Sequence, residues 1–236
     1  SLGSLGWVAG GAQSVVEALL TAVGPSGTLV MPTQSGQLSD PAGWSDPPVP
    51  AEWIDGLRDT LPAYDPHLTA TRSMGAIVEC FRSHPDAVRS AHPLLSFAAI
   101  GPLTRQVLEP HAFTPGFGES SPLGRLYELD AQVLLLGVDH ESNTSLHLAE
   151  HRAEWEGKVD VPTSAPMLVD GERRWVTEPD LDIDESDFAA IGDAFAASGG
   201  ERTFGVASAT ARLCRVRDVV DFAVAWMPEH RPGSLD

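Results

Sequence analysis

The strongest constraint on the fold is one apolar run, AQVLLLGV at residues 131–138. Eight residues suit a strand better than a helix, and the lack of alternating polar positions predicts a strand buried on both faces. The polar segment DHESNTSLHLAEHRAEWE follows directly, with Asn143 or Thr144 placed to cap a helix. A buried strand that leads into a helix is typical of α/β proteins.

Strand and helix patterns alternate along the rest of the chain. The further predicted elements are helices at 12–23 and 73–83, strands at 27–32 and 96–101, a long loop at 33–50, and a hairpin at 160–177 around Asp170-Gly171. We therefore predict an α/β fold, with a mixed, mostly buried β-sheet flanked by helices.

The charge balance restricts the classes of ligand. The chain has 33 acidic and 15 basic residues, a net charge of −18. Such a surface repels nucleic acid and attracts a polycation. An acidic surface that serves solubility alone, or a high-salt host, explains the charge equally well.

Neither a membrane anchor nor a disulfide framework is expected. No apolar run approaches the roughly 20 residues that span a bilayer, and no basic-then-apolar leader opens the sequence. Cys80 and Cys214 are the two cysteines, which fits a reducing cytoplasm. A monomer and a homodimer are both compatible with the sequence.

The best candidate site follows the strand at 131–138. On a helix, His147 lies one turn from Glu150 and His151. Acyl transfer to an amine needs a base, because an ammonium must lose a proton before it can attack. Histidine titrates nearest to neutral pH, and a carboxylate can orient its ring. A capped helix with two surface histidines would show the same spacing.

The same residues also spell His-x-x-Glu-His, the inverted zinc-peptidase motif. Two imidazoles on one helix face suit zinc, and Glu201 or Glu229 would supply the third ligand. The match fixes only three positions, so this alternative stays open beside the acid–base interpretation.

Other short motifs offer weaker candidates. Gly10-Gly11 precedes a helix and exposes bare backbone, as a tight turn also would. Ser73, Met74 and Gly75 open a second helix, and Arg72 is placed to meet a phosphate. Hydroxyls such as that of Ser121 can hydrogen-bond a ligand. His92 is either a second imidazole of the site or, as we favour, a satisfied loop histidine.

Three long segments together resemble the aminoglycoside 3-N-acetyltransferases of the antibiotic N-acetyltransferase family. They are GWVAGGAQSVVEALLTAVGPSGTLVMPT, DPHLTATRSMGAIVECFRSHPDAVRSAHPLLSFAAIG and GESSPLGRLYELDAQVLLLGVDHESNTSLHLAEHRA. The resemblance implies an acetyl-CoA donor, a 2-deoxystreptamine antibiotic as acceptor, and no metal. An antibiotic-binding relative without catalytic activity remains a third possible function.

The resemblance also implies roles for individual residues. The family's helix histidine falls on His147, and its accompanying acids fall on Glu141 and Glu150. The coenzyme contacts fall on Gly10, Gly11, Thr71, Arg72, Ser73, Met74, Gly75 and Ser121. We assign the acceptor contacts to Asp65, Glu79, His92, Asp139 and Asn143, and further ammonium contacts to the acidic loop 178–187.

The sequence departs from the family pattern at its start. Relatives carry an upstream helix and a strand ending in His-Ser, and neither is present before Ser1. We expect a single acetyltransferase-like domain over residues 1–236 that could lack this N-terminal helix and strand.

Overall fold

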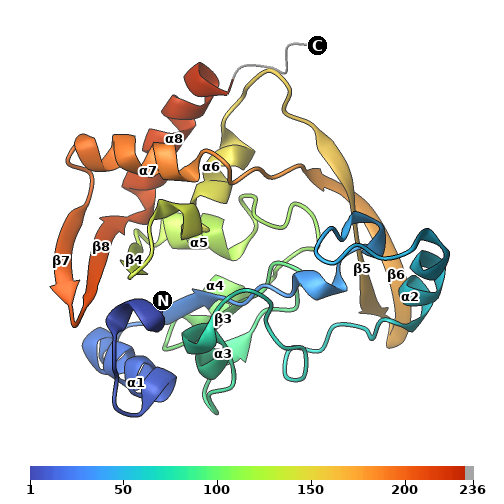
Figure 1. The fold of residues 1–236 in the computed structure, drawn as a ribbon, viewed down its shortest axis with the longest axis horizontal. Coiled ribbons are helices and arrows are strands. Elements are labelled where there is room, and N and C mark those ends of the chain that lie inside the picture. The colour runs from blue at the N-terminus through green and yellow to red at the C-terminus, as the bar shows by residue number, and fades with distance from the viewer. Residues whose placement is uncertain (232–236) are drawn as a thin grey trace.

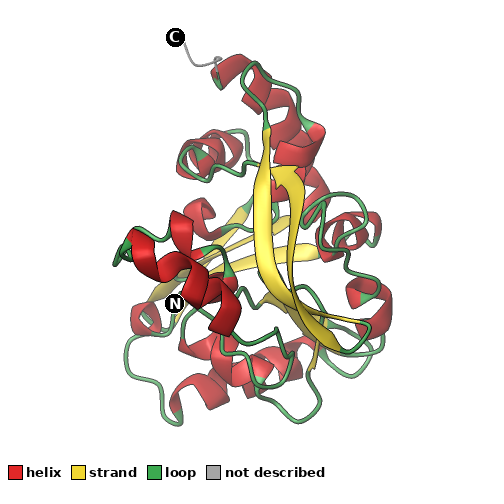
Figure 2. Cartoon of the chain, turned by 90° about the vertical axis from the view of Figure 1, so that its right-hand side faces the viewer, coloured by secondary structure: helices red, strands yellow, loops and turns green. Residues whose placement is uncertain are grey.

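The computed structural model describes residues 1–231. Helices lie on both sides of the strands (Figures 1 and 2), which confirms the predicted α/β class. Within the described range, no helix is long and apolar enough to cross a bilayer. The helices are α1 (Gly11–Val23), α2 (Ile54–Thr60), α3 (Ala76–Arg82), α4 (Thr104–Leu108), α5 (Pro122–Glu128), α6 (Leu146–Arg152), α7 (Phe188–Ala197) and α8 (Val216–His230).

The strands form antiparallel sheets in the orders β1-β3-β2, β4-β8-β7 and β5-β6. Short 3₁₀ turns at Gly36–Leu38 and Pro41–Gly43 shape the predicted loop at 33–50. The strands are β1 (Leu29–Pro32), β2 (Val88–Arg89), β3 (Phe97–Ile100), β4 (Gln132–Leu136), β5 (Asp160–Val169), β6 (Glu172–Leu181), β7 (Arg202–Val206) and β8 (Ala209–Arg215).

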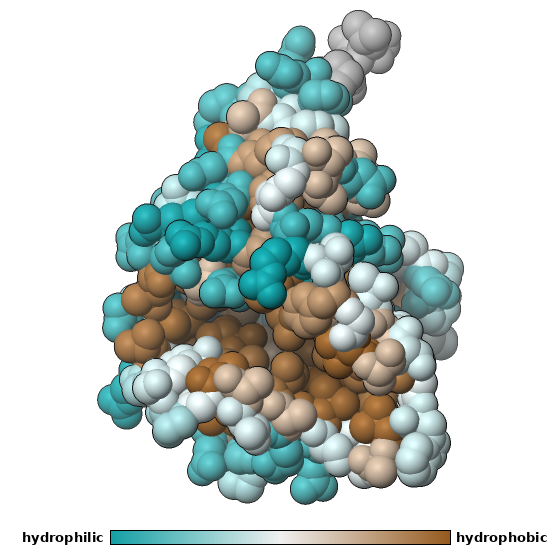
Figure 3. Space-filling view, turned by 90° about the vertical axis from the view of Figure 1, so that its left-hand side faces the viewer, coloured by the Kyte–Doolittle hydropathy of each residue, from teal (hydrophilic) through white to brown (hydrophobic). Residues whose placement is uncertain are grey.

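Strand β4 corrects one prediction. The run at 131–138 does form a strand, but the expected burial on both faces is wrong. Among the described strands, β4 pairs with β8 alone, so it is an edge strand. Leu134 is 40% exposed whereas Leu135 is buried. Figure 3 shows apolar surface on the side of the molecule that carries α1, β7 and β8.

The predicted hairpin is confirmed and is longer than expected. Strands β5 and β6 pair from Asp160–Leu181 to Val169–Glu172, as the longest strands in Figure 2. Asp170 and Gly171 both have positive φ (54° and 81°), the two left-handed positions that a tight type I′ turn requires. Strand β6 carries the first part of the acidic segment back to the core, where Asp180 is buried.

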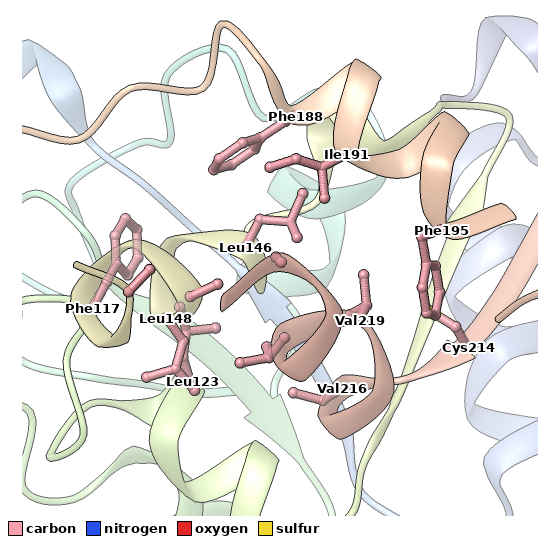
Figure 4. Close-up of a cluster of buried hydrophobic side chains, with 14 of the residues drawn as sticks. Phe117, Leu123, Leu146, Leu148, Phe188, Ile191, Phe195, Cys214, Val216 and Val219 are labelled. Atoms are coloured by element: carbon pink, nitrogen blue, oxygen red, sulfur yellow. The ribbon is translucent and has the colours of Figure 1, made fainter. Parts of the chain in front are cut away.

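The main core lies where α6, α7 and α8 meet. Leu146 and Leu148 of α6 pack with Ile191 of α7 and Val219 and Val220 of α8, and each is fully buried (Figure 4). One face of α6 is thereby fixed in apolar contacts, which sets the direction of its polar side chains.

Candidate active site

Helix α6 follows β4 through a short, tightly constrained connection. Gly137 has φ 64°, and a Cβ there would lie 2.6 Å from the nearest side-chain atom, so glycine is required. The Asn143 Oδ1 atom then accepts a hydrogen bond from the backbone N–H of Ser145 at 3.1 Å. This bond holds the turn that begins α6. The cap position itself is Ser145, which makes no side-chain cap hydrogen bond, and not Asn143 or Thr144 as the sequence predicted.

His147 and Glu150 form a buried pair on α6. The His147 Nδ1 and Glu150 Oε2 atoms are 2.6 Å apart, and the two residues are 5% and 0% exposed. An ionised carboxylate only accepts hydrogen bonds, so we assign the ring proton to Nδ1. The lone pair then lies on Nε2, which is the atom available as a base.

Glu150 is held from its other side as well. Its Oε1 atom accepts hydrogen bonds from the Arg231 guanidinium and from the Asp184 backbone N–H, both at 2.8 Å. Arg231 also donates to both carboxylate oxygens of Asp187, at 2.7 and 2.6 Å. The Glu150 carboxylate therefore has a fixed position, and it accepts hydrogen bonds from three donors: His147 Nδ1, the Arg231 guanidinium and the Asp184 N–H.

Two aromatic rings enclose the imidazole of His147. Phe117 stacks on it with a centroid distance of 4.7 Å and an interplanar angle of 3°, and Phe188 lies 4.9 Å away at 57°. Within the described residues, Nε2 has no hydrogen-bond partner, and it is not a fully buried polar atom. The ring is thus locked in orientation, and its Nε2 atom is not engaged by any described residue.

A cavity of about 240 Å³ lies next to Phe117, the ring that stacks on His147, and its lining includes neither His147 nor Glu150. Phe117 and His151 line it, together with the acidic residues Asp40 and Asp180 and the hydroxyl of Ser164. Burial lowers the pKa of His151, which favours its neutral form. The cavity thus combines an aromatic wall with two carboxylates, of which Asp40 is paired with Arg58 and Asp180 accepts from the Gly116 and Leu181 N–H groups.

Comparison with known proteins assigns the family. The family model described as aminoglycoside 3-N-acetyltransferase matches residues 1–228. The chain belongs to this family. Among curated relatives, the prophage-derived aminoglycoside N(3′)-acetyltransferase-like protein YokD of Bacillus subtilis is 45% identical, over 96% of this chain and 83% of YokD. Aminoglycoside N(3)-acetyltransferase VII of Streptomyces paromomycinus is 39% identical, over 97% and 83% of the two chains.

Solved structures show the same relationship. The crystal structure of YokD superposes with a TM-score of 0.95 at 44% identity, covering 98% of this chain and 85% of that one. The structure of AAC-IIIb in a binary complex with CoASH has a TM-score of 0.85 at 30% identity, covering 100% and 90%. The predicted family and acyltransferase class are therefore confirmed.

The structure distinguishes the two acids that the family pattern places near His147. Glu150 contacts the imidazole directly, whereas Glu141 is exposed on the turn before α6. The carboxylate that orients the ring of this acetyltransferase is therefore Glu150.

The expected coenzyme contacts lie at the starts of two helices that pack together, α1 and α3. Gly10 and Gly11 have φ values of 78° and 59° and open α1, while Gly75 (φ 85°) precedes α3. Arg72 and Ser73 are exposed in the same loop as Gly75, with Thr71 and Met74 partly buried. Ser121 differs, because it is fully buried and caps α5 by accepting from the Leu123 N–H.

Two of the expected acceptor carboxylates are engaged locally. Asp65 accepts from the backbone N–H groups of His67 and Leu68. Glu79 binds both the backbone and the hydroxyl of Thr71, and the hydrogen bond from Arg82 lowers the pKa of Glu79 to about 2. Neither residue lines the cavity. These acids hold the 65–82 segment in shape.

The other three expected acceptor contacts also lie outside the cavity lining. His92 is buried with both ring nitrogens bonded, which is the satisfied loop histidine that the sequence favoured. Asp139 is exposed and pairs with Arg212, and Asn143 is buried at the start of α6.

A second histidine–glutamate pair was missed by the sequence. The Nε2 atom of His140 is 2.9 Å from Glu201 Oε2, and its Nδ1 atom is 3.1 Å from the Asn143 amide. Arg212 in turn binds Glu201. Glu201 is thus engaged elsewhere and not near His147, and residues 1–231 contain no group of three side chains placed to hold a metal.

Proposed function

We propose that the chain transfers the acetyl group of acetyl-CoA to the 3-amino group of 2-deoxystreptamine aminoglycosides, with His147 as general base. The observation that carries this proposal is the buried His147–Glu150 pair, whose Nε2 has no partner among the described residues and whose ring stacks on Phe117, a residue of the cavity lining. The family supports the reaction class, and the CoASH complex of AAC-IIIb supports the donor.

Direct transfer is the simplest reaction that this geometry allows. His147 Nε2 takes a proton from the substrate ammonium, and the resulting amine attacks the thioester carbonyl. A C–N bond forms, the C–S bond breaks, and the CoA thiolate leaves and is protonated. Glu150 stabilises the imidazolium that forms in between.

The cavity supports a cationic acceptor. Asp40 and Asp180 place carboxylates in the lining, and Phe117 joins this lining to the imidazole of His147. An aminoglycoside amine seated there would approach the ring past Phe117. The other ammonium groups would meet the carboxylates, in a protein whose net charge of −18 attracts polycations.

The loops before α1 and α3 suit the donor. Gly10 and Gly11 carry no side chains that would block the approach to the start of α1, although the Gly11 N–H donates to the Val8 carbonyl, and Arg72 is an exposed cation close to Gly75. Coenzyme A carries phosphates, which bind to such donors. Hydrogen-bond donors of Ser73 or Gly75 could form an oxyanion hole for the tetrahedral intermediate, and each such bond would lower the activation barrier by about 3 kcal/mol.

Thiol release tests the proposal. With acetyl-CoA and a panel of aminoglycosides, we expect CoA thiol to appear only when both substrates are present. His147→Ala should lower kcat by about 10²–10⁴-fold. His84→Ala, at a partly buried histidine outside the cavity lining, is the control and should keep the parent rate. Normal turnover by His147→Ala would exclude the base assignment.

The two alternatives give different outcomes in the same experiments. A binding protein without activity would retain aminoglycoside affinity in calorimetry and release no thiol. A zinc peptidase would purify with stoichiometric metal and cleave peptides in a chelator-sensitive manner. Either result would replace acetyl transfer as the function.

A further inference from the structure

Four side chains that can carry charges of alternating sign form one continuous hydrogen-bonded row, which is fully buried at Glu150 and partly buried at Asp187. His147 bonds to Glu150, Glu150 to Arg231, and Arg231 to Asp187. The distances along the row are 2.6, 2.8 and 2.6 Å. Arg231 and Asp187 come from the end of α8 and the start of α7, so the row joins three helices.

Several further contacts hold the Arg231 side chain in this row. Its side chain is 9% exposed, and its guanidinium also donates to the Asp184 carbonyl at 2.7 Å. The Trp155 ring lies 4.9 Å from the guanidinium carbon. A planar group that binds two carboxylates at once fixes both of them in direction.

The charges of the row have a simple balance. With a neutral imidazole, Glu150 and Asp187 contribute two negative charges and Arg231 one positive charge, which leaves one net negative charge. With an imidazolium the row is neutral. A cation alone behind Glu150 would cancel the carboxylate and disfavour protonation of His147, and Asp187 removes that effect.

We propose that Arg231 and Asp187 act as a matched pair of positioning residues, in which Arg231 fixes the Glu150 carboxylate and Asp187 neutralises Arg231 so that His147 keeps its capacity to accept a proton. This inference rests on the proposed role of His147 as general base. Neither residue touches the cavity, so both act through Glu150.

The other charged or titratable groups around His147 differ from this row. On α6, His151 faces the cavity, and Arg152 is paired with Glu119 at the surface. In the segment after α6, Lys158 donates to the carbonyls of His151 and Ala153. At the end of β6, the Asp180 carboxylate accepts from the backbone N–H groups of Gly116 and Leu181. The Asp184 carboxylate accepts from the Ser186 N–H. Variants at Arg231 and Asp187 leave all these groups in place.

Two variants should shift the pH at which the His147 imidazole loses its proton, in opposite directions. Arg231→Gln removes a positive charge, so the His147 imidazole should hold its proton to higher pH. Asp187→Asn removes a negative charge, so the ring should lose its proton at lower pH. NMR titration of the ring resonances should place the two midpoints about one pH unit or more apart, on either side of the parent value.

Further variants separate charge from geometry. The double variant Arg231→Gln/Asp187→Asn restores the balance and should return the midpoint close to that of the parent. Arg231→Lys keeps the charge but loses the planar double contact, so the midpoint should stay and kcat should fall. Arg212→Gln is the matched control, because it disturbs the His140–Glu201 pair and should leave the His147 midpoint unchanged.

The NMR titration measures the midpoint of the His147 ring and does not require turnover. The charge-balance proposal and the acetyl-transfer proposal can therefore be rejected independently of each other. Opposite shifts in a protein that releases no thiol would uphold the charge balance and reject the acetyl-transfer function. Equal shifts, or none, in folded Arg231→Gln and Asp187→Asn proteins would reject the charge balance, whatever the activity. Midpoint shifts in Arg231→Lys as large as those in Arg231→Gln would reject it as well.

Discussion

Replacing Glu150 by glutamine tests the proton arrangement of the site most directly. The side chain keeps its shape and loses its charge. Both donors on the Oε1 side, Arg231 and the Asp184 N–H, require an oxygen to accept their hydrogen bonds. The glutamine oxygen must therefore face them, and its NH₂ group must face His147.

That orientation changes the tautomer of the imidazole. The Nδ1 atom of His147 would accept a hydrogen bond from the amide 2.6 Å away, where it now donates to the carboxylate. The ring proton then moves to Nε2, the accessible nitrogen, which can no longer take a proton from the substrate. Since a positioned base contributes about 10²–10⁴-fold to rate, kcat should fall by that amount.

The structure also limits the cost to stability. Breaking a buried ion pair can cost about 3–5 kcal/mol when one partner is left alone. Arg231 keeps both contacts with Asp187, and the glutamine oxygen still accepts its N–H. We therefore expect a loss of about 1–3 kcal/mol, which leaves a typical domain folded at 25 °C.

Three measurements on Glu150→Gln check this reasoning. Thiol release gives kcat, ¹⁵N NMR of His147 identifies the protonated nitrogen, and urea unfolding gives the change in stability. The exposed Glu229→Gln variant on α8 is the control and should match the parent. A folded Glu150→Gln protein with kcat within about threefold of the parent would refute the proposed tautomer control.

Three further results are expected. Burial lowers the pKa of His92 to about 3 and that of His111 to about 4, so both histidines stay neutral in the folded protein. Because histidines of the unfolded chain (pKa about 6.5) do bind protons, the free energy of unfolding should fall as pH drops from about 6.5 towards 4. The expected loss, measured by urea unfolding, is up to about 1.4 kcal/mol per histidine and pH unit. A slope unchanged in His111→Gln would contradict this cause. Gly192→Ala should lower Tm, because its Cβ would lie 2.3 Å from the His140 Cβ, whereas Gly56→Ala, a helical glycine with open space, should not. The aminoglycoside KM should rise with added salt, and a flat response would argue against electrostatic capture.

The sequence was most informative where the interactions are local. The His147–Glu150 contact joins residues three apart on one helix, and the turn at Asp170-Gly171 needs only its own two residues. Helical and strand periodicity likewise placed most elements. The single-domain prediction for residues 1–236 stays a prediction, and residues 232–236 lie outside the described structure.

Non-local contacts explain what the sequence did not reveal. Arg231 reaches Glu150 across 81 positions, and no short motif announces such a pairing. The outer position of β4 depends on its neighbouring strands and not on its own apolar residues. The local role of Asp65 was not foreseen either, because the residue type does not show that its carboxylate accepts from the N–H groups of His67 and Leu68; its contact with the acceptor stays a prediction.

The two histidine–glutamate pairs show why residue types alone cannot identify the base. Each contains a buried imidazole, a glutamate, an arginine and an aspartate, and both lie close to the end of β4 in the chain. In His140 both ring nitrogens are bonded within the protein, so no lone pair or proton is left for a substrate. In His147 only Nδ1 is bonded within the described residues, so Nε2 keeps its lone pair. The role in proton transfer that we propose for one pair and the structural role of the other thus differ by a single hydrogen bond, that of the Asn143 amide to His140.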